Sequence, residues 1–194
     1  MDQRDIVTKA LTLLNEVGLE GITTRRLAKA LDVKGPSLYY HISSMQELFG
    51  HMANTLIVQA TDSVDIEMRW SDWLRATAMQ IRNVLLEYRD GARLLTAAWP
   101  DEEMRGQTIP RLAAPLIREG IAVNEAQEAV AMMASFTIGW MMNEQNSDIR
   151  RLMVTQMNVD AAFERSIATI LVGLAARFGL SAPAASQLLA VSHH

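Results

Sequence analysis

The residues whose types and spacing could do chemistry gather between Thr23 and Ile42, in the segment TTRRLAKALDVKGPSLYYHI. Arg25 supplies a planar fork of N–H donors that matches the O6 and N7 atoms of guanine. Hydroxyl, phenol and imidazole groups around it can reach phosphate oxygens and thymine methyl groups, contacts that fix register and read little sequence. Together these groups predict contact with double-stranded DNA through Thr23, Thr24, Arg25, Lys34, Gly35, Pro36, Ser37, Tyr39, Tyr40 and His41.

Two short helices joined by a tight turn must position these side chains. The first helix starts behind Thr23 or Thr24 as its N-cap. Its apolar residues recur at helical spacing: Leu27, Ala28 and Leu31. It should end near Asp32, because the turn needs a left-handed residue and Asp tolerates that conformation better than most.

The second helix should begin after Gly35, with Pro36 in a first-turn position where a missing N–H costs nothing. We expect it to continue through PSLYYHI, with Leu38 inward, Tyr39 facing phosphate and Tyr40 partly packed. This is the arrangement of a helix-turn-helix that places its second helix in the major groove. An ordinary helical hairpin within a bundle is the alternative.

Helical periodicity continues along the chain and predicts an all-α fold. An amphipathic helix over 4–17 precedes the helix-turn-helix, and a connecting helix over about 44–61, capped by Ser43 or Ser44, follows it. We therefore expect a three-helix DNA-binding head over 1–45, a larger helical body over 62–180 for effector binding and dimerisation, and a tail over 181–194.

Within the body, apolar spacing predicts helices over 70–89 and 92–97. Residues 101–119 should form a kinked or split helix, because Pro110 and Pro115 interrupt it.

Two late helices, about 124–146 and 160–178, are apolar on most sides, with Asn124 expected to cap the first and a polar connection between them. They hold more apolar surface than one small domain covers, which predicts a homodimer through these helices, with Leu171 and Leu174 in the interface. Packing within a single chain is the alternative.

The formal net charge of −4 argues against a generally basic nucleic-acid binder, but the charges are unevenly placed. Residues 1–42 have six Lys or Arg and five acids, whereas the remainder has twelve Arg and seventeen acids. A mildly basic head on an acidic body is expected if only the head meets phosphate.

Several classes of protein are disfavoured by what the sequence lacks. There is no Cys, no glycine-rich phosphate loop and no HExxH, so we predict no catalytic residue, no metal ligand and no cofactor. A helical enzyme of unknown type is a remote alternative. The uncharged apolar run from Ala129 to Met142 has 14 residues and is too short to span a bilayer. With no signal-like apolar run at the N-terminus, we expect a cytoplasmic protein without a membrane partner.

The run KALTLLNEVGLEGITTRRLAKALDVKGPSLYYHISSMQELF resembles the DNA-binding domain of the tetracycline-repressor (TetR) family. WSDWLRATAMQIRNVLLEYRDGARLL and SFTIGWMMNEQ are similar to core segments of the tetracycline repressors themselves, so the resemblance covers most of the first 150 residues. It implies a homodimeric repressor, joined by its two late helices, that leaves a palindromic operator when a small molecule binds each body. In the head, Gly35 stands where the relatives have a base-reading side chain, and Met45 replaces a phosphate-binding lysine.

The resemblance also implies that the tetracycline ligands are missing. Leu95 stands where the relatives hold a magnesium–tetracycline chelate through an imidazole, and Asn143 where an acid reaches the metal's water shell. Thr77 and Leu112 fall at about the positions of an asparagine and a glutamine that hydrogen-bond the drug. Magnesium prefers oxygen ligands, which these positions cannot supply as a set.

Methionines are frequent and suit a pocket for an apolar ligand of irregular shape, although they suit a plain core equally well. Met132, Met133, Met141 and Met142 cluster in sequence. We predict a metal-free, largely apolar effector bound by Thr77, Ile81, Leu95, Trp99, Leu112, Met133, Phe136, Trp140 and Asn143. The alternatives are a regulator whose ligand promotes DNA binding and a helical ligand- or partner-binding protein without operator recognition.

Overall fold

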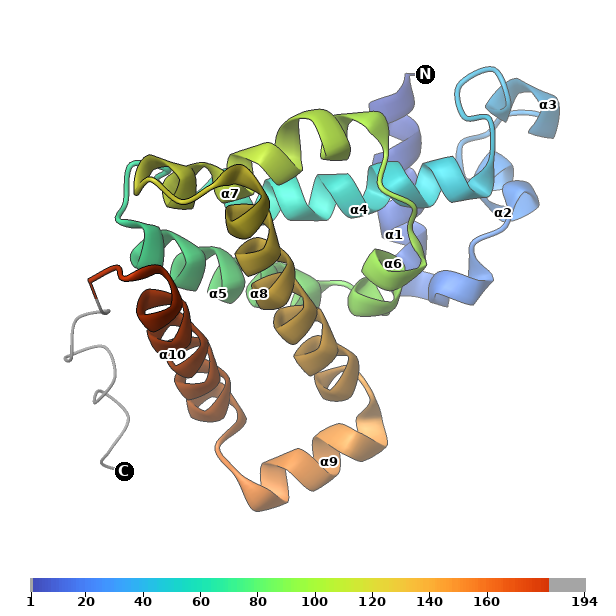
Figure 1. Cartoon of the computed structure of the whole chain (residues 1–194). Coiled ribbons are helices and arrows are strands. Elements are labelled where there is room, and N and C mark those ends of the chain that lie inside the picture. The colour runs from blue at the N-terminus through green and yellow to red at the C-terminus, as the bar shows by residue number, and fades with distance from the viewer. Residues whose placement is uncertain (1, 182–194) are drawn as a thin grey trace.

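The computed structural model describes residues 2–181, a range that is helical and contains no strand (Figure 1). The head comprises α1 (Gln3–Val17), a 3₁₀ turn (Leu19–Gly21), α2 (Thr24–Ala30) and α3 (Gly35–Leu38). The connecting helix is α4 (Met45–Thr61). The body contains α5 (Trp70–Glu87), α6 (Gly91–Ala97), a π-helical turn (Met104–Thr108), α7 (Ile109–Arg118), α8 (Val123–Glu144), α9 (Ser147–Gln156) and α10 (Val159–Phe178). The predicted all-α fold with a helix-turn-helix head and a larger body is confirmed. Of the predicted tail, only Ser181 lies within the described residues.

The start of α4 is fixed by side chains around Ser44, which is the N-cap residue. The Ser44 hydroxyl oxygen accepts the N–H of Glu47 at 3.0 Å. The Glu47 carboxylate in turn accepts the backbone N–H and the hydroxyl of Ser43, each at 2.5 Å. These bonds satisfy donors that a helix start leaves without partners, and they join the last residues of the head to the connecting helix.

Two clusters of buried apolar residues form the core. One lies wholly within the body and contains Trp70, Trp73, Leu74, Leu116, Ala126, Phe163, Ile167 and Leu171, among others. The other runs from the head into the body and includes Ile6, Leu14, Leu27, Leu38, Leu48, Met52, Ile81, Leu85, Ala92 and Met141. Because this second cluster extends from α1 to α8, the packing of the head is continuous with that of the body.

A buried ion pair ties three body helices together. The guanidinium of Arg82 on α5 donates to both carboxylate oxygens of Glu144 on α8, at 2.9 and 2.6 Å, and to Asp160 on α10 at 2.6 Å. Arg82 also lies over the ring of Phe163, 5.2 Å from its centroid, and the indole N–H of Trp140 donates to Glu144 at 3.0 Å. Burial alone would lower the pKa of Arg82, but its hydrogen bonds to the carboxylates of Glu144 and Asp160 outweigh burial and raise this pKa.

The helix boundaries correct two expectations. The N-cap of α8 is Ala122 and no side chain caps the helix, so the prediction that Asn124 is the cap is wrong. α9 occupies most of the segment expected to be a polar connection, and none of its residues is buried within the chain. The helix was missed because an unburied helix shows little apolar periodicity. Pro110 lies in the first turn of α7 and Pro115 inside it, behind the π-helical turn, so residues 101–119 are split as predicted.

No helix among residues 2–181 combines the length and the apolar character needed to cross a membrane.

The ion pair yields a stability prediction. Replacing Arg82 with Ala leaves the buried Glu144 carboxylate without its cation, so the free energy of unfolding should fall by about 3–5 kcal/mol. The double variant Arg82→Leu with Glu144→Leu should recover most of that loss, because no uncompensated charge remains. Urea unfolding at one fixed protein concentration, followed by circular dichroism, measures both. An unchanged midpoint in the Arg82→Ala variant would show that the pair contributes little.

Candidate DNA interface and effector cavity

The turn between α2 and α3 has the backbone that the sequence predicts. Asp32 adopts a φ of 55°, in the left-handed region, and the N–H of Val33 donates to the carbonyl of Ala28 at 3.0 Å. Ala28 is buried, so a small side chain lies where the two helices approach each other. The turn therefore fixes the angle at which α3 leaves α2.

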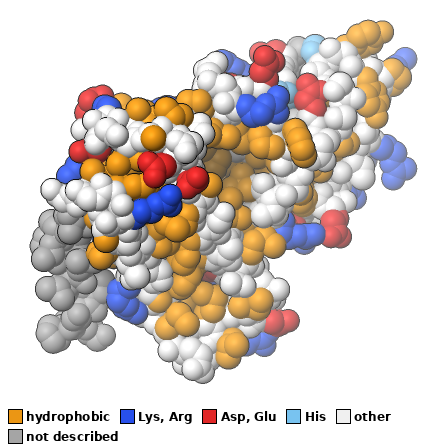
Figure 2. All heavy atoms as spheres, viewed as in Figure 1, with side chains coloured by type: hydrophobic (Ala, Val, Ile, Leu, Met, Phe, Trp, Pro, Cys, Tyr) orange, Lys and Arg blue, Asp and Glu red, His pale blue; other side chains and the backbone are white. Residues whose placement is uncertain are grey.

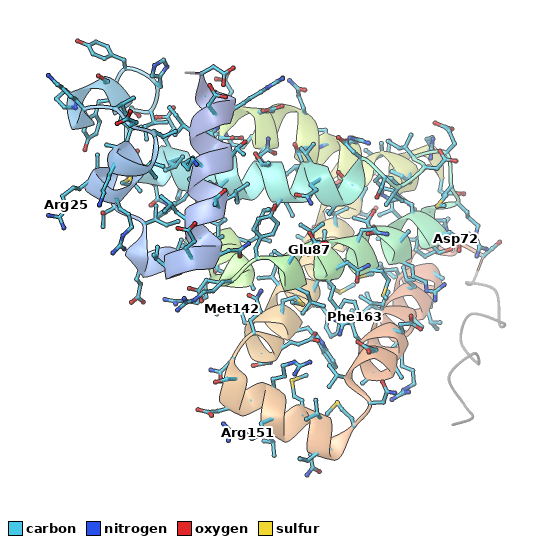
Figure 3. The ribbon with its side chains drawn as sticks, turned by 180° about the vertical axis from the view of Figure 1, so that it is seen from behind. Arg25, Asp72, Glu87, Met142, Arg151 and Phe163 are labelled. Atoms are coloured by element: carbon cyan, nitrogen blue, oxygen red, sulfur yellow. The ribbon has the colours of Figure 1, made fainter. Side chains whose placement is uncertain are left out.

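Arg25 lies at the outer edge of the head and points into solvent (Figure 3). Thr23 caps α2 by accepting the N–H of Arg26 at 3.2 Å, and the Arg26 guanidinium donates back to the carbonyl of Gly21. Arg25 makes no hydrogen bond or ion pair with any residue in 2–181, so its donor fork is free for a ligand.

The recognition segment is less helical than expected. α3 ends at Leu38, and residues 39–41 continue as a turn. Tyr39 is 56% exposed, with its hydroxyl 3.4 Å from that of Thr24. Tyr40 is 86% exposed, so the expectation that it is partly packed is wrong. Leu38 and Ile42 take the two buried positions, which leaves the turn between them in solvent.

A shallow hollow between α2 and α3 collects the other candidate groups. It is lined by Thr24, Arg25, Ala28, Lys29, Val33 and Gly35. A Cβ built on Gly35 would meet no atom within 4 Å, so packing does not require glycine there. The other predicted residues Lys34, Pro36, Ser37 and His41 do not line the hollow, and each has at least part of its surface in water. Lys29 was not predicted, although its place one turn after Arg25 could have identified it.

The body contains an apolar cavity of about 250 Å³. α4 contributes Ala53 and Ile57, and the segment after α6 contributes Ala98, Pro100 and Met104. Ile81, Leu95, Thr108, Ile109, Leu112, Gln127, Val130, Ala131, Ala134, Thr137 and Ile138 complete the lining. The predicted positions Ile81, Leu95 and Leu112 are thus brought together, and the wall is apolar as expected. The contributions of α4 and of the segment after α6 were missed, because their apolar residues read equally well as plain core.

Beside this cavity lies a smaller hollow of about 30 Å³, lined by Thr77 and Met133 among others. Five residues line both spaces: Ile81, Leu112, Val130, Ala134 and Thr137. Thr77 is 5% exposed and its hydroxyl has no hydrogen-bond partner, whereas the Thr137 hydroxyl donates to the carbonyl of Met133 at 2.9 Å. An unpaired buried hydroxyl is costly and gains most from a partner that enters the space.

Four predicted effector residues lie outside both spaces. Trp99 is 70% exposed and Asn143 is also exposed. Phe136 stacks on Phe163 with centroids 5.8 Å apart, and the Trp140 ring lies 5.6 Å from the same residue. The two α8 aromatics point toward α10 instead of the cavity, so they hold helices together. Of the four clustered methionines, only Met133 lines either of these two spaces.

The outward face of α8 is rich in apolar and small residues, and Figure 2 shows apolar atoms following this helix toward α9. Exposed residues on it include Met132, Ser135, Gly139 and Met142. On α10 the exposed residues include Thr169, Val172, Gly173 and Ala176. Leu171 and Leu174 are buried in the same chain, at 1% and 2% exposure, so their expected place in a subunit interface is wrong. Leu171 and Leu174 lie on the face of α10 that packs into the body core.

The families and relatives that this chain resembles are consistent with this geometry. Residues 6–52 match the family described as bacterial regulatory proteins, tetR family, and residues 65–151 match the tetracyclin repressor-like C-terminal domain. The tetracycline repressor class A from transposon 1721 of Escherichia coli is 31% identical, and the alignment covers 89% of each chain. The class D repressor of Escherichia coli is 31% identical over 147 residues, which cover 75% of this chain and 67% of that protein.

Solved structures are similar over almost the whole chain. A variant of TetR from Acinetobacter baumannii AYE, in complex with minocycline, has a TM-score of 0.78 and 30% identity, covering 93% of this chain and 99% of that one. The class A repressor bound to 5a,6-anhydrotetracycline and magnesium has a TM-score of 0.73 and 31% identity, covering 91% and 99%. BioQ with its double-stranded DNA operator, at 23% identity and a TM-score of 0.68 over 91% and 99%, shares the fold.

A helix-turn-helix with an unpaired arginine at its tip, a helical body with an apolar cavity and these likenesses lead to one conclusion. The chain belongs to the TetR family of bacterial regulatory proteins and is a DNA-binding transcriptional regulator.

Proposed function

We propose that this regulator is a repressor that binds a palindromic operator as a homodimer and leaves it when a small, largely apolar, metal-free effector enters the body. The supporting observation is the position of the cavity, whose lining includes Ala53 and Ile57 of the helix that begins at the end of the recognition segment. An occupant of the cavity therefore touches the element that sets the orientation of the head.

We further propose that the protein works in the cytoplasm, where chromosomal DNA lies, and acts by binding without catalysis. Membership of a family of DNA-binding regulators supports both points. A two-fold dimer presents two identical heads, so the half-site centres should be about one helical turn apart or a small multiple of it, roughly 34–36 Å per turn.

The proposed DNA contact rests on the free guanidinium of Arg25. The Arg25→Ala variant should lose about 1–3 kcal/mol on the specific site and accept other base pairs at one position in each half-site. Duplexes selected from a random pool by the unaltered protein provide the probe, and fluorescence anisotropy gives the affinities. Lys34→Ala is the control, because losing a phosphate contact should weaken selected and random duplexes alike. Equal losses on both duplexes for Arg25→Ala would identify a phosphate contact instead.

The proposed effector is neutral and mostly apolar because the cavity wall is. Thr77 offers one unpaired hydroxyl at the edge of the smaller hollow, so a molecule with a single hydrogen-bonding group at one end matches the two spaces. A charged chelate does not match them, because its polar atoms would be buried against apolar side chains such as Leu95.

Magnesium–tetracycline should therefore not bind. Each buried polar group left without a partner costs roughly 1–3 kcal/mol, and Leu95 offers a methyl group where the relatives' imidazole would hold the metal. Titrating the protein with tetracycline and magnesium, while following Trp fluorescence, should give no saturable signal at micromolar concentrations. The class A repressor is the positive control. Saturable binding that a chelator abolishes would refute the proposal of a metal-free effector.

The proposed dimer forms through the exposed faces of α8 and α10. Val172, which is 39% exposed, lies among small residues on α10, and a charge there would be buried between subunits. Val172→Glu should give a folded monomer by light scattering, with unchanged helicity and lost operator binding. Leu171→Glu places the same charge one residue earlier, inside the protomer, and should unfold the body. A dimer that survives Val172→Glu would place the interface elsewhere.

A further inference from the structure

His51 lies at a junction between the head, the connecting helix and the body. Its ring is on α4, with Nδ1 2.7 Å from an oxygen of Asp101 and Nε2 2.5 Å from the side-chain amide of Gln3 on α1. On the other side, Nε2 is 3.5 Å from a carboxylate oxygen of Glu47. The Asp101 side chain is almost fully buried, so this contact is shielded from water far more than a surface pair.

The charges around His51 are mostly negative. Glu47 lies on α4 itself, and Asp101 and Glu103 come from the segment before α7. His51, Asp101 and Glu103 line a groove between α1 and α4, and Arg4 of α1 is the positive charge in its lining. Hydrogen bonds from Ser43 lower the pKa of the Glu47 carboxyl, so Glu47 stays ionised where a histidine titrates.

The hydrogen-bond partners of the two ring nitrogens determine which contacts change when His51 gains a second proton. With one ring proton, Nδ1–H donates to Asp101 and Nε2 accepts from the Gln3 amide. With two, both nitrogens donate, so Nε2–H must turn to the Glu47 carboxylate or to the oxygen of a reversed Gln3 amide. The imidazolium then has a carboxylate on each side, and both contacts become charge-assisted.

The two carboxylates lead to different ends of the molecule. Asp101 also accepts the N–H of Met104 at 2.7 Å, and Met104 lines the effector cavity. Glu47 accepts from Ser43, which follows the recognition segment and its buried Ile42. A protonated His51 therefore closes an unbroken chain of polar contacts from the cavity wall to the end of the DNA-binding element.

We propose that His51 is a proton-operated latch between the cavity wall and the recognition segment, which makes operator affinity depend on pH. In the protonated state the chain from Asp101 through His51 to Glu47 holds the head in one orientation, so less ordering remains to be done on DNA. Operator binding is then tighter on the acid side. The proposal adds a regulatory input and rests on the DNA-binding function.

The test uses a duplex that was selected at pH 7. The affinity of the protein for this duplex is measured at pH 6 and at pH 8, at constant ionic strength. The unaltered protein should bind this duplex about fivefold more tightly at pH 6 than at pH 8, which is a coupling of ordinary size between two sites. His51→Gln keeps a hydrogen-bonding side chain but cannot be charged, so most of this step should disappear. His41 remains in both proteins, and its own contribution is therefore common to them.

Two further variants separate the latch from a general effect of charge. Asp101→Asn keeps the oxygen that caps Met104 but removes the carboxylate, so it should also lose the step. Glu103→Gln removes a charge from the same groove without touching the latch, so it should keep the step. An equal pH step in His51→Gln and the unaltered protein would overturn the proposal, as would its loss in Glu103→Gln.

A measurement without DNA decides the same point. In ¹⁵N spectra of the imidazole, Nδ1 of His51 should be protonated throughout pH 5–8, and only Nε2 should gain a proton as the pH falls. An unprotonated Nδ1 at pH 8 would overturn the latch. This result holds even for a protein that bound no selected duplex, a failure that would count against the proposed function instead.

Discussion

The bidentate pair between Arg82 and Glu144 fixes the position of α8, on which two other properties of the body depend. One face of α8 lines the effector cavity through Val130, Ala134 and Thr137, and another presents its exposed small and apolar residues to solvent. A helix with an apolar surface on several sides can pack in several rotations. Among the described residues the buried Glu144 carboxylate has one cationic partner, Arg82, so only a few rotations of α8 are allowed. Any other rotation would leave the charge of Glu144 uncompensated. The pair thus selects which face meets the cavity.

The continuity of the core explains how the cavity can influence the head. Ile81 belongs both to the cavity lining and to the buried cluster that extends into the head through α4. Since a close-packed interior transmits displacement and does not absorb it, a ligand that moves the cavity wall acts on the packing of the head. The sequence divides into a head and a body, but the buried cluster that includes Ile81 contains residues of both. Such a joint suits a regulator, because independent units would exchange little free energy.

The sequence was most informative where local chemistry decides the outcome. The left-handed Asp32, the split around Pro110 and the free Arg25 each follow from a residue's own conformational or hydrogen-bonding limits. It was least informative about which neighbour an apolar face meets. Phe136 packs on α10 and not into the cavity, and Leu171 packs into its own chain, because helical spacing shows that a face is apolar but not what covers it. The latch at His51 was equally invisible, since its partners lie 48 and 50 residues away.

Structural and cavity-lining roles fall mostly on different side chains in this body, so the lining can change while the fold persists. Thr108 combines both roles, because it lines the cavity and donates to Asn54 on α4 at 2.8 Å. The polar contacts that hold the helices, around Arg82 and Gln145, lie outside the cavity; Gln145 alone bonds the backbone of Leu85, Tyr88 and Ala92. Inside the cavity, the side chains of Leu95 and Leu112 make only apolar contacts, and the hydrogen bond from the Trp73 indole goes to the backbone carbonyl of Leu112. Exchanging either side chain for a polar one therefore leaves the helix-to-helix hydrogen bonds intact. Thr77, in the smaller hollow beside the cavity, is buried and polar, and its hydroxyl has no partner among the described residues. Under the proposed function, the effector would supply that partner.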